Sequence, residues 1–172
     1  MDIKNKSQFI EYFSKGTKGS NNLKIGVEHE RFLFEGQNKK RISYETLKKL
    51  FENLKVNGWE PLYEKGNIIG MQRNKQQITT EPGLQCELSG APLENIHQVC
   101  SESSKFLKEI EIASKGLDVN TVSIGFDPFN NLSDIPQSPK TRYKIMTKEM
   151  PKGGKQSLEM MYRACGIQIN YD

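Results

Sequence analysis

The sequence predicts an α+β fold in which helices cover one face of an antiparallel sheet. Three separate stretches alternate apolar and polar residues at the period of a β-strand, at 24–34, 78–88 and 167–172. Two longer stretches, which begin at Ser43 and after Pro92, repeat apolar residues at helical spacing. Joined in one sheet, the strands would bury their apolar sides under these helices and leave a polar face open.

The N-terminal part is expected to place a helix on each side of the first strand. Ser7 is expected to cap a short helix that Gly16 ends, with Phe9, Ile10 and Phe13 as its apolar residues. After the strand, a helix from Ser43 to about Val56 would bury one stripe, formed by Leu47, Leu50, Phe51 and Leu54. Residues 59–69 read as short β pieces, and residues 70–76 as a hairpin connection.

The second alternating stretch, ITTEPGLQCEL, is interpreted as one strand over residues 78–88. Its Pro82–Gly83 pair indicates an edge position or a β-bulge, both of which are common near active sites. One face would carry polar groups and the other apolar ones. The polar set is Thr79, Glu81, Gly83, Gln85 and Glu87, and the apolar set is Leu84, Cys86 and Leu88.

The C-terminal part is expected to alternate helices with two further strands. A long helix with Pro92 in its first turn would bury a stripe of Leu93, Ile96, Val99, Cys100, Ser103, Phe106, Leu107 and Ile110. TVSIGFDP, at 121–128, reads as a third strand on the same core. A turn-rich loop at 129–142 is long enough to suggest a functional role. Short helices are expected at 143–150 and 157–164, before a last strand with Gln168 and Asn170 on its polar face.

Length and composition limit the class of protein. The 172 residues are enough for one domain, and the 25 Lys and Arg against 21 Asp and Glu are scattered, so no nucleic-acid footprint is indicated. Three cysteines cannot all pair within the chain and match no zinc spacing, so reduced thiols are expected. No stretch reaches the roughly 18 apolar residues that a membrane helix needs. We therefore expect a cytoplasmic protein that binds neither nucleic acid nor membrane.

The polar faces of these strands indicate a magnesium site. Glu28 and Glu30 point to the same side of the first strand, with side chains roughly 7 Å apart. Glu81 and Glu87 would join them on one floor, together with Gln85, Gln168 and Asn170. Crowded carboxylates repel one another unless cations lie between them, and Mg²⁺ prefers such hard oxygen ligands. For each strand taken alone, a solvated polar face is the alternative interpretation.

A nucleotide would be held here through metal ions and basic side chains. The phosphate-binding pattern GxxxxGK[ST] is absent, and PKGGK resembles it only weakly. Arg142 and Arg163 are candidates for anion binding, with surface or ion-pair roles as the alternative. His29 and His97 lie on apolar or helical faces, which favours structural roles. No Ser–His–Asp or Cys–His arrangement indicates a covalent hydrolase.

Four segments follow one another along the chain: GVEHERF, ITTEPGLQCELSGAPLENIHQVC, RYKIM with MPKGG, and MMYRACGIQINYD. In order and spacing they resemble the N-terminal part of the glutamate–cysteine ligases of plants and many proteobacteria, over residues 24–172. The resemblance implies a glutamine-synthetase-like antiparallel sheet flanked by helices. Because family members are longer, residues 1–172 are expected to be the N-terminal part of a single catalytic domain, a truncated fragment with little or no activity alone. A homodimer is one option for the full-length form.

The resemblance also implies a reaction and its residues. Such enzymes use ATP and Mg²⁺ to join the γ-carboxylate of glutamate to the amine of cysteine through an acyl phosphate, the first step of glutathione biosynthesis. Magnesium would be bound by Glu28, Glu30, Glu81 and Glu87. Arg163 would be catalytic, and substrate would be held by Arg142, Tyr143, Gln168 and Asn170. Cys100 is similar to a cysteine of plant members that forms a redox-sensitive disulfide, but no matching partner is evident.

Two other classes of function stay open on the sequence alone. The first is another carboxylate–amine ligase of the same superfamily, because no residue that recognises cysteine is identifiable. The second is a truncated, non-catalytic fragment that binds a metal ion or nucleotide, or that associates with a complementary chain. Acceptor specificity would separate the first alternative from the ligase, and turnover would separate the second.

Overall fold

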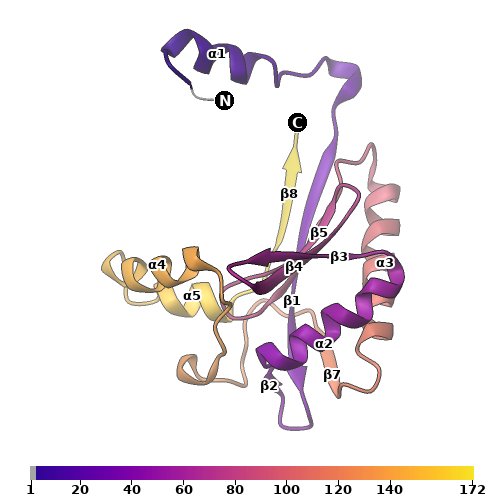
Figure 1. Ribbon diagram of the computed structural model, residues 1–172, viewed down its shortest axis with the longest axis vertical. Coiled ribbons are helices and arrows are strands. Elements are labelled where there is room, and N and C mark those ends of the chain that lie inside the picture. Colours follow the sequence, from indigo (N-terminus) through magenta and orange to yellow (C-terminus); the bar gives the residue numbers. More distant parts are fainter. Residues whose placement is uncertain (1–2) are drawn as a thin grey trace.

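The computed structural model describes residues 3–172, and in it one long strand organises an antiparallel sheet (Figure 1). The α+β class predicted from the sequence is confirmed. The sheet runs in the order β2-β1-β6-β5-β4-β3, and β7 and β8 also pair with β1. Its strands are β1 (Ile25–Glu35), β2 (Lys40–Arg41), β3 (Glu60–Glu64), β4 (Asn67–Arg73), β5 (Gln76–Thr80), β6 (Cys86–Ser89), β7 (Val119–Val122) and β8 (Ile167–Tyr171).

Five α-helices accompany the sheet within the described residues. They are α1 (Lys6–Ser14), α2 (Tyr44–Leu54), α3 (Ile96–Ala113), α4 (Thr141–Glu149) and α5 (Ser157–Arg163). Single 3-10 turns lie at Ser20–Asn22, Lys55–Asn57, Leu132–Asp134 and Met150–Lys152. Across residues 3–172, none of the helices is both long and apolar enough to cross a membrane.

Strand β1 organises the sheet because it pairs with four other strands. Its first half lies between β6 and β8, with Glu30 opposite Glu87 and Glu28 opposite Gln168. Its second half pairs with β7 and β2, where Phe34 lies opposite both Asn120 and Arg41. All of these pairings are antiparallel, so one strand fixes the register of most of the sheet.

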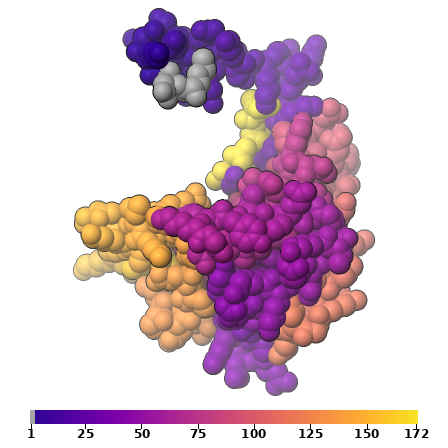
Figure 2. All heavy atoms as spheres, in the orientation of Figure 1, coloured from indigo at the N-terminus to yellow at the C-terminus, as the bar shows by residue number. Residues whose placement is uncertain are grey.

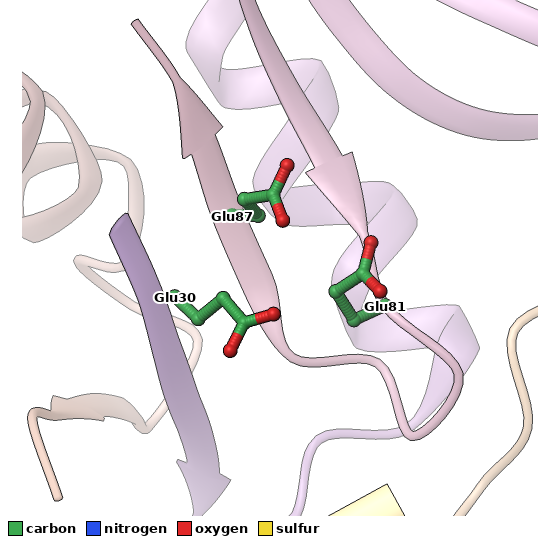
Figure 3. Close-up of side chains that lie close together, drawn as sticks. All are labelled: Glu30, Glu81 and Glu87. Carbon is green, nitrogen blue, oxygen red and sulfur yellow. The ribbon is translucent and has the colours of Figure 1, made fainter. Parts of the chain in front are cut away.

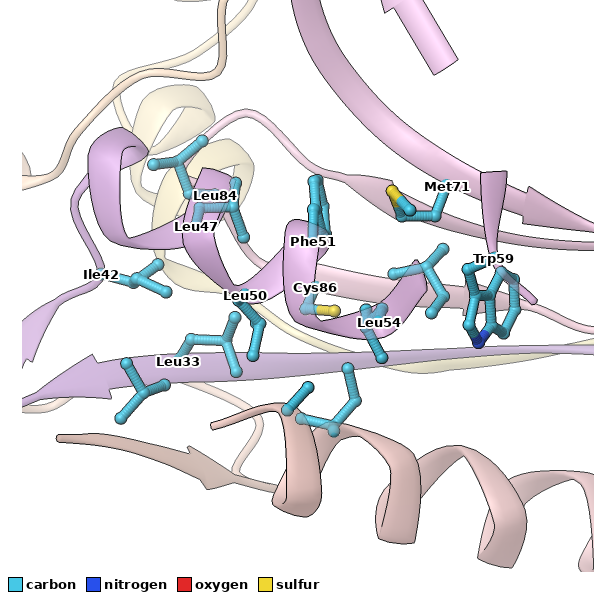
Figure 4. Packing of buried hydrophobic residues seen from close by; sticks show 14 of the residues in the cluster. Leu33, Ile42, Leu47, Leu50, Phe51, Leu54, Trp59, Met71, Leu84 and Cys86 are labelled. Atoms are coloured by element: carbon cyan, nitrogen blue, oxygen red, sulfur yellow. The ribbon is translucent and has the colours of Figure 1, made fainter. Parts of the chain in front are cut away.

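The main core forms where α2 and α3 pack against the apolar side chains of the sheet (Figure 4). The four apolar residues expected from α2 are all fully buried, and the Ser43 side chain caps the helix by accepting a hydrogen bond from the Thr46 backbone N–H. In α3, Val99, Phe106 and Ile110 are buried as expected. Each buried apolar side chain of this size stabilises the fold by roughly 1.5–3 kcal/mol.

The start of α3 differs from the prediction. The helix begins at Ile96, with the Asn95 side chain as its cap, so Pro92 precedes the helix rather than lying in its first turn. The buried stripe is shifted toward the end of the helix: Ile96 and Cys100 are exposed, and Glu109 and Ala113 are buried instead. Periodicity alone therefore gave the face of the helix but misplaced its first turn.

Residues 78–88 form a hairpin instead of the single strand that the alternation predicted. Strands β5 and β6 pair antiparallel, with Thr79 opposite Glu87, and Pro82–Gly83 lies in the turn. Both strands are interior to the sheet, so the expected edge position is wrong. Leu84 adopts a positive φ of 59° in this turn.

The tip of this hairpin removes Gln85 from the polar floor where it was expected. Gln85 is buried, and its amide accepts a hydrogen bond from Gly83 N–H and donates to the carbonyl oxygens of Met161 and Ala164. A Cβ on Gly83 would lie 2.7 Å from the Tyr162 carbonyl oxygen, so only glycine fits this close approach. The hairpin tip is thereby docked against α5 and the residues after it.

Three other elements also differ from their predictions. Helix α1 is capped by Asn5, not Ser7, and Phe9, Ile10 and Phe13 are exposed because the helix stands apart from the body (Figure 2). The third strand is β7 at 119–122, not 121–128. Residues 70–73 belong to β4, so the connection to β5 is shorter than expected.

Helices α4 and α5 form a second lobe beside the sheet, which Figure 2 shows in orange and yellow. Its own small core contains Ile135, Tyr143, Met161 and Tyr162. A buried ion pair connects this lobe to the sheet: Arg41 of β2 lies 3.3 Å from Asp127, and both side chains are fully buried. Arg41 also donates hydrogen bonds to the carbonyl oxygens of Tyr162 and Gly83, and so holds α5 and the hairpin tip together.

We expect Arg41→Met to lower the free energy of unfolding by about 3–5 kcal/mol, because it leaves the Asp127 carboxylate buried without its counter-ion. Urea denaturation followed by circular dichroism measures this loss. Lys40→Met, at the exposed neighbouring position, is the matched control and should change stability little. A loss of less than about 1 kcal/mol for Arg41→Met would contradict the structural role given to the pair.

Candidate metal centre

Antiparallel register brings glutamates from three parts of the chain onto one face of the sheet. Glu28 and Glu30 lie on β1, and Glu87 on β6 is the direct partner of Glu30. Residues opposite each other in an antiparallel pair project to the same side. Glu81 follows the last residue of β5 and approaches from the hairpin. The four glutamates predicted to share a floor therefore line one pocket.

Three of these side chains converge closely (Figure 3). Carboxylate oxygens of Glu30, Glu81 and Glu87 all lie within 4.8 Å of one another, and each residue is half-buried. Three carboxylates form a hard, anionic oxygen donor set that fits Mg²⁺. Glu28 lies outside this triad and lines the same pocket.

The electrostatics of the triad favour a bound cation. Burial raises the pKa of Glu30, and the neighbouring carboxylates of Glu81, Glu87 and Glu28 raise it further, against a hydrogen bond from the Gly166 N–H. Burial and Glu87 likewise raise the pKa of Glu81. Both groups are held in surroundings where their charged forms are disfavoured until positive charge arrives.

The glutamates open into a pocket of about 610 Å³, which is large enough for a substrate-sized molecule. A second hollow of about 180 Å³ shares Glu28, Glu30, Glu87 and Gln168 with it. The wall opposite β1 is basic and contains Lys140 and Arg142 at the start of α4. The pocket therefore combines an anionic floor with a cationic wall.

Of the two neighbouring residues predicted to bind substrate, Arg142 lines this wall, whereas Tyr143 lies behind it in the small core of the second lobe, so its expected role stays a prediction. The Tyr143 hydroxyl is buried and lies 3.0 Å from Oε1 of Glu81 and 3.2 Å from the carbonyl oxygen of Thr80, the two acceptors within its reach. Arg142 donates to the same hydroxyl at 2.6 Å, and its guanidinium lies 3.7 Å from Glu81. Burial raises the pKa of Tyr143, so the hydroxyl remains a donor that orients Glu81.

The structure places two other predicted residues differently. Arg163 pairs with Glu159 at 2.7 Å and donates to the Asp127 carbonyl oxygen at 2.8 Å, so its guanidinium is engaged outside the lining of the glutamate pocket. Asn170 lies opposite Gly26, farther along β1, and accepts a hydrogen bond from Gln168, which does line the pocket. The roles expected for Arg163 and Asn170 stay predictions.

Sequence reasoning missed several residues of the pocket. Lys140 is the most consequential, since it is buried and faces the glutamates from the opposite wall. The one available signal was its position in the turn-rich loop expected to be functional, two residues before the start of RYKIM. The other missed lining residues are Leu62, Glu64, Ile69, Gln77 and Ser89.

The antiparallel sheet and its carboxylate triad define an α+β protein with a candidate divalent-metal centre. The family model for glutamate–cysteine ligase family 2 matches residues 24–172. The chain belongs to this family.

Curated relatives agree with this assignment. The chain is 40% identical over 168 residues to glutamate–cysteine ligase A, chloroplastic, of Oryza sativa subsp. japonica, an alignment that covers 97% of this chain and 34% of the relative. It is also 40% identical to the chloroplastic enzyme of Medicago truncatula and 39% identical to that of Arabidopsis thaliana, over 97% of this chain and 33% and 32% of the relatives. The chain thus spans about a third of the length of the relatives it matches.

The comparison corrects one expectation from the sequence. The relatives are named as chloroplastic enzymes, so the cytoplasmic location inferred from composition is wrong. Reduced cysteines and the lack of a long apolar stretch do not distinguish the cytoplasm from other compartments, which is why composition could not reveal this.

We expect Glu30→Gln to stabilise the metal-free chain at about pH 7.5. Raised pKa values mean that the folded state binds protons more tightly than the unfolded state, so the charged triad destabilises the fold above those pKa values and this effect is lost as the pH falls. The melting temperatures of Glu30→Gln and wild type should therefore converge at about pH 4. Thermal unfolding across this pH range measures the difference.

The same variant should lose the response to metal. At a Mg²⁺ concentration of 100 times its Kd, wild type should gain about 2.7 kcal/mol of stability, and Glu30→Gln much less. Glu60→Gln, at an exposed position of β3, is the control and should respond like wild type. An equal Mg²⁺-dependent stabilisation of Glu30→Gln and wild type would argue against a metal centre at the triad.

Proposed function

We propose that this chain forms part of a Mg²⁺- and ATP-dependent glutamate–cysteine ligase. The observation that carries the proposal is the convergence of Glu30, Glu81 and Glu87 on the floor of a large pocket with a basic wall. Membership of glutamate–cysteine ligase family 2 and the names of the relatives support the same activity. Since the relatives are about three times as long, the proposed activity is that of the whole ligase.

The proposed reaction has two steps. A γ-carboxylate oxygen of glutamate attacks the γ-phosphorus of ATP, and the bond from that phosphorus to the ADP oxygen breaks. The amine of cysteine then attacks the acyl carbon, the carbon–oxygen bond to phosphate breaks, and the nitrogen loses a proton. Phosphoryl transfer of this kind depends mainly on positioning and on neutralising charge.

The residues of the chain would position the reactants. Glu30, Glu81 and Glu87, with Glu28 beside them, would hold Mg²⁺, which when bound neutralises charge on phosphoryl oxygens. Tyr143 keeps Glu81 aimed into the pocket through its hydroxyl, and the Gly166 N–H orients Glu30 from the other side. Because these donors belong to a sheet and a docked lobe, little reorganisation is needed when substrate binds.

Other features of the proposal follow the family resemblance. We propose that the sheet belongs to a glutamine-synthetase-like catalytic domain, that glutamate and cysteine are the substrates, and that a homodimer is one arrangement of the full-length enzyme. A ligase with another amine acceptor and a metal-binding chain without turnover are the competing functions. The basic wall, which suits an anionic phosphoryl group, favours a ligase over a chain that only binds metal, and the names of the relatives favour cysteine over another amine acceptor.

An assay of ADP release tests the proposal. It is run with ATP, Mg²⁺, glutamate and cysteine, on the 172-residue chain and on a longer version that carries a relative's remaining length. We expect cysteine-dependent turnover in the longer version, and a loss of at least about 100-fold in Glu28→Gln, which removes a carboxylate from the pocket. Glu60→Gln is again the control.

The outcomes separate the alternatives. Turnover with another amine in place of cysteine would favour the related ligase. Mg²⁺ binding without turnover in either version would favour a metal-binding chain. If the Glu28→Gln variant retained full turnover, this would contradict the proposal that the reaction takes place in this pocket.

A further inference from the structure

Lys140 is an enclosed residue whose ammonium forms no ion pair with a carboxylate of the described residues, although Glu81, Glu87 and Glu64 lie near enough to attract it. The residue is only 7% exposed and lies in the wall of the 610 Å³ pocket. Among residues 3–172, its ammonium makes no hydrogen bond and has no carboxylate within 4.0 Å; it lies 5.4 Å from the centre of the Tyr143 ring. The stem of the side chain is buried while the ammonium borders the pocket without a hydrogen-bond partner, so an anion that enters the pocket can form a charge-assisted hydrogen bond with it.

Contacts on both sides fix the backbone that carries Lys140. Before it, the Ser138 hydroxyl lies 2.9 Å from the Thr80 hydroxyl at the end of β5. After it, the Thr141 N–H donates to a carboxylate oxygen of Glu64 at 2.8 Å, which caps the start of α4. Lys140 is therefore held in place before any ligand binds, as a preorganised anion site requires.

Arg142, two residues away, has a different role. Its guanidinium already donates to the Tyr143 hydroxyl and lies 3.7 Å from Glu81, so much of its charge is used within the protein. Its side chain is also 64% exposed, whereas Lys140 is enclosed. Of the two cations in the wall, Lys140 is therefore the one whose charged group is available to bind a ligand.

We propose that Lys140 binds an oxygen of the phosphoryl group that is transferred in this pocket, across from the Glu30–Glu81–Glu87 triad. The proposal rests on the proposed function, because the triad would hold Mg²⁺. A phosphoryl group has oxygens on several sides, so metal ions can contact one side and an ammonium another. A carboxylate is planar and has only two oxygens, so it is less suited to contact metal ions on one side and Lys140 on the other.

Binding measurements on Lys140→Met test this assignment. Methionine keeps the length of the buried stem and removes the charge. Calorimetric titrations are made with Mg²⁺ alone, with inorganic phosphate in the presence of Mg²⁺, with Mg²⁺–ATP, and with glutamate. We expect phosphate and Mg²⁺–ATP to bind at least about 10-fold more weakly to the variant, because a charge-assisted hydrogen bond is lost. Affinity for Mg²⁺ alone should be retained.

Two further variants separate charge from structure. Lys140→Arg keeps the charge and should recover part of the phosphate affinity. Lys144→Met lies on an exposed position of α4 and should bind phosphate like wild type. The melting temperature of Lys140→Met is measured beside the titrations.

Three results for Lys140→Met would overturn the assignment. The first is unchanged affinity for phosphate and Mg²⁺–ATP, and the second is a loss of affinity for glutamate in place of phosphate. The third is a loss of both Mg²⁺ and phosphate binding together with a lowered melting temperature. Wild type that binds Mg²⁺ but not phosphate or Mg²⁺–ATP would also overturn it. Wild type that fails to bind Mg²⁺ would instead overturn the proposed function, so the two failures can be told apart.

Discussion

The antiparallel register of β1 is the constraint on which the rest of the structure depends. It sets Glu30 directly opposite Glu87 and so places like charges side by side, an arrangement that destabilises a sheet when nothing neutralises it. The opposite face of the same strands compensates, because Cys86 and Leu88 of β6 pack with Leu33 of β1 in the core under α2 and α3. One register therefore produces both the stabilising core and the strained polar floor.

The second lobe completes the pocket because it is fastened to this sheet. Arg41 joins β2 to Asp127, to the hairpin tip and to α5 in one buried cluster. The hairpin tip carries Glu81 to the triad, and the segment that leads into α4 brings Lys140 to the opposite wall. The geometry of the site is thus coupled to a structural ion pair that takes no direct part in its chemistry.

The sequence was sufficient to predict the features of the site that depend on a single strand. Alternation placed Glu28 and Glu30 together because strand geometry alone decides which side a side chain takes. The assignment failed at Gln85, since Pro82–Gly83 and the positive φ of Leu84 turn the chain and break the alternation. Glu81 and Glu87 still meet, but they do so across a hairpin. The burial of Lys140 and the engagement of Arg163 by Asp127 depend on contacts between distant segments, which no local pattern encodes.

The buried Arg41–Asp127 pair and the charged groups of the pocket differ in whether opposite charges contact each other, and this difference distinguishes a structural cluster from a binding site. Arg41 and Asp127 are fully buried, and each meets its partner inside the protein, as expected of charges that hold a fold together. The carboxylates of Glu30, Glu81 and Glu87 face one another, and Lys140 on the opposite wall is paired with none of them. Opposite charges that shared only a structural role would be expected to close on each other. Lys140 and Glu81 attract each other across the pocket without forming an ion pair, and a ligand that brings cations to one side and anionic oxygens to the other would give both groups direct partners.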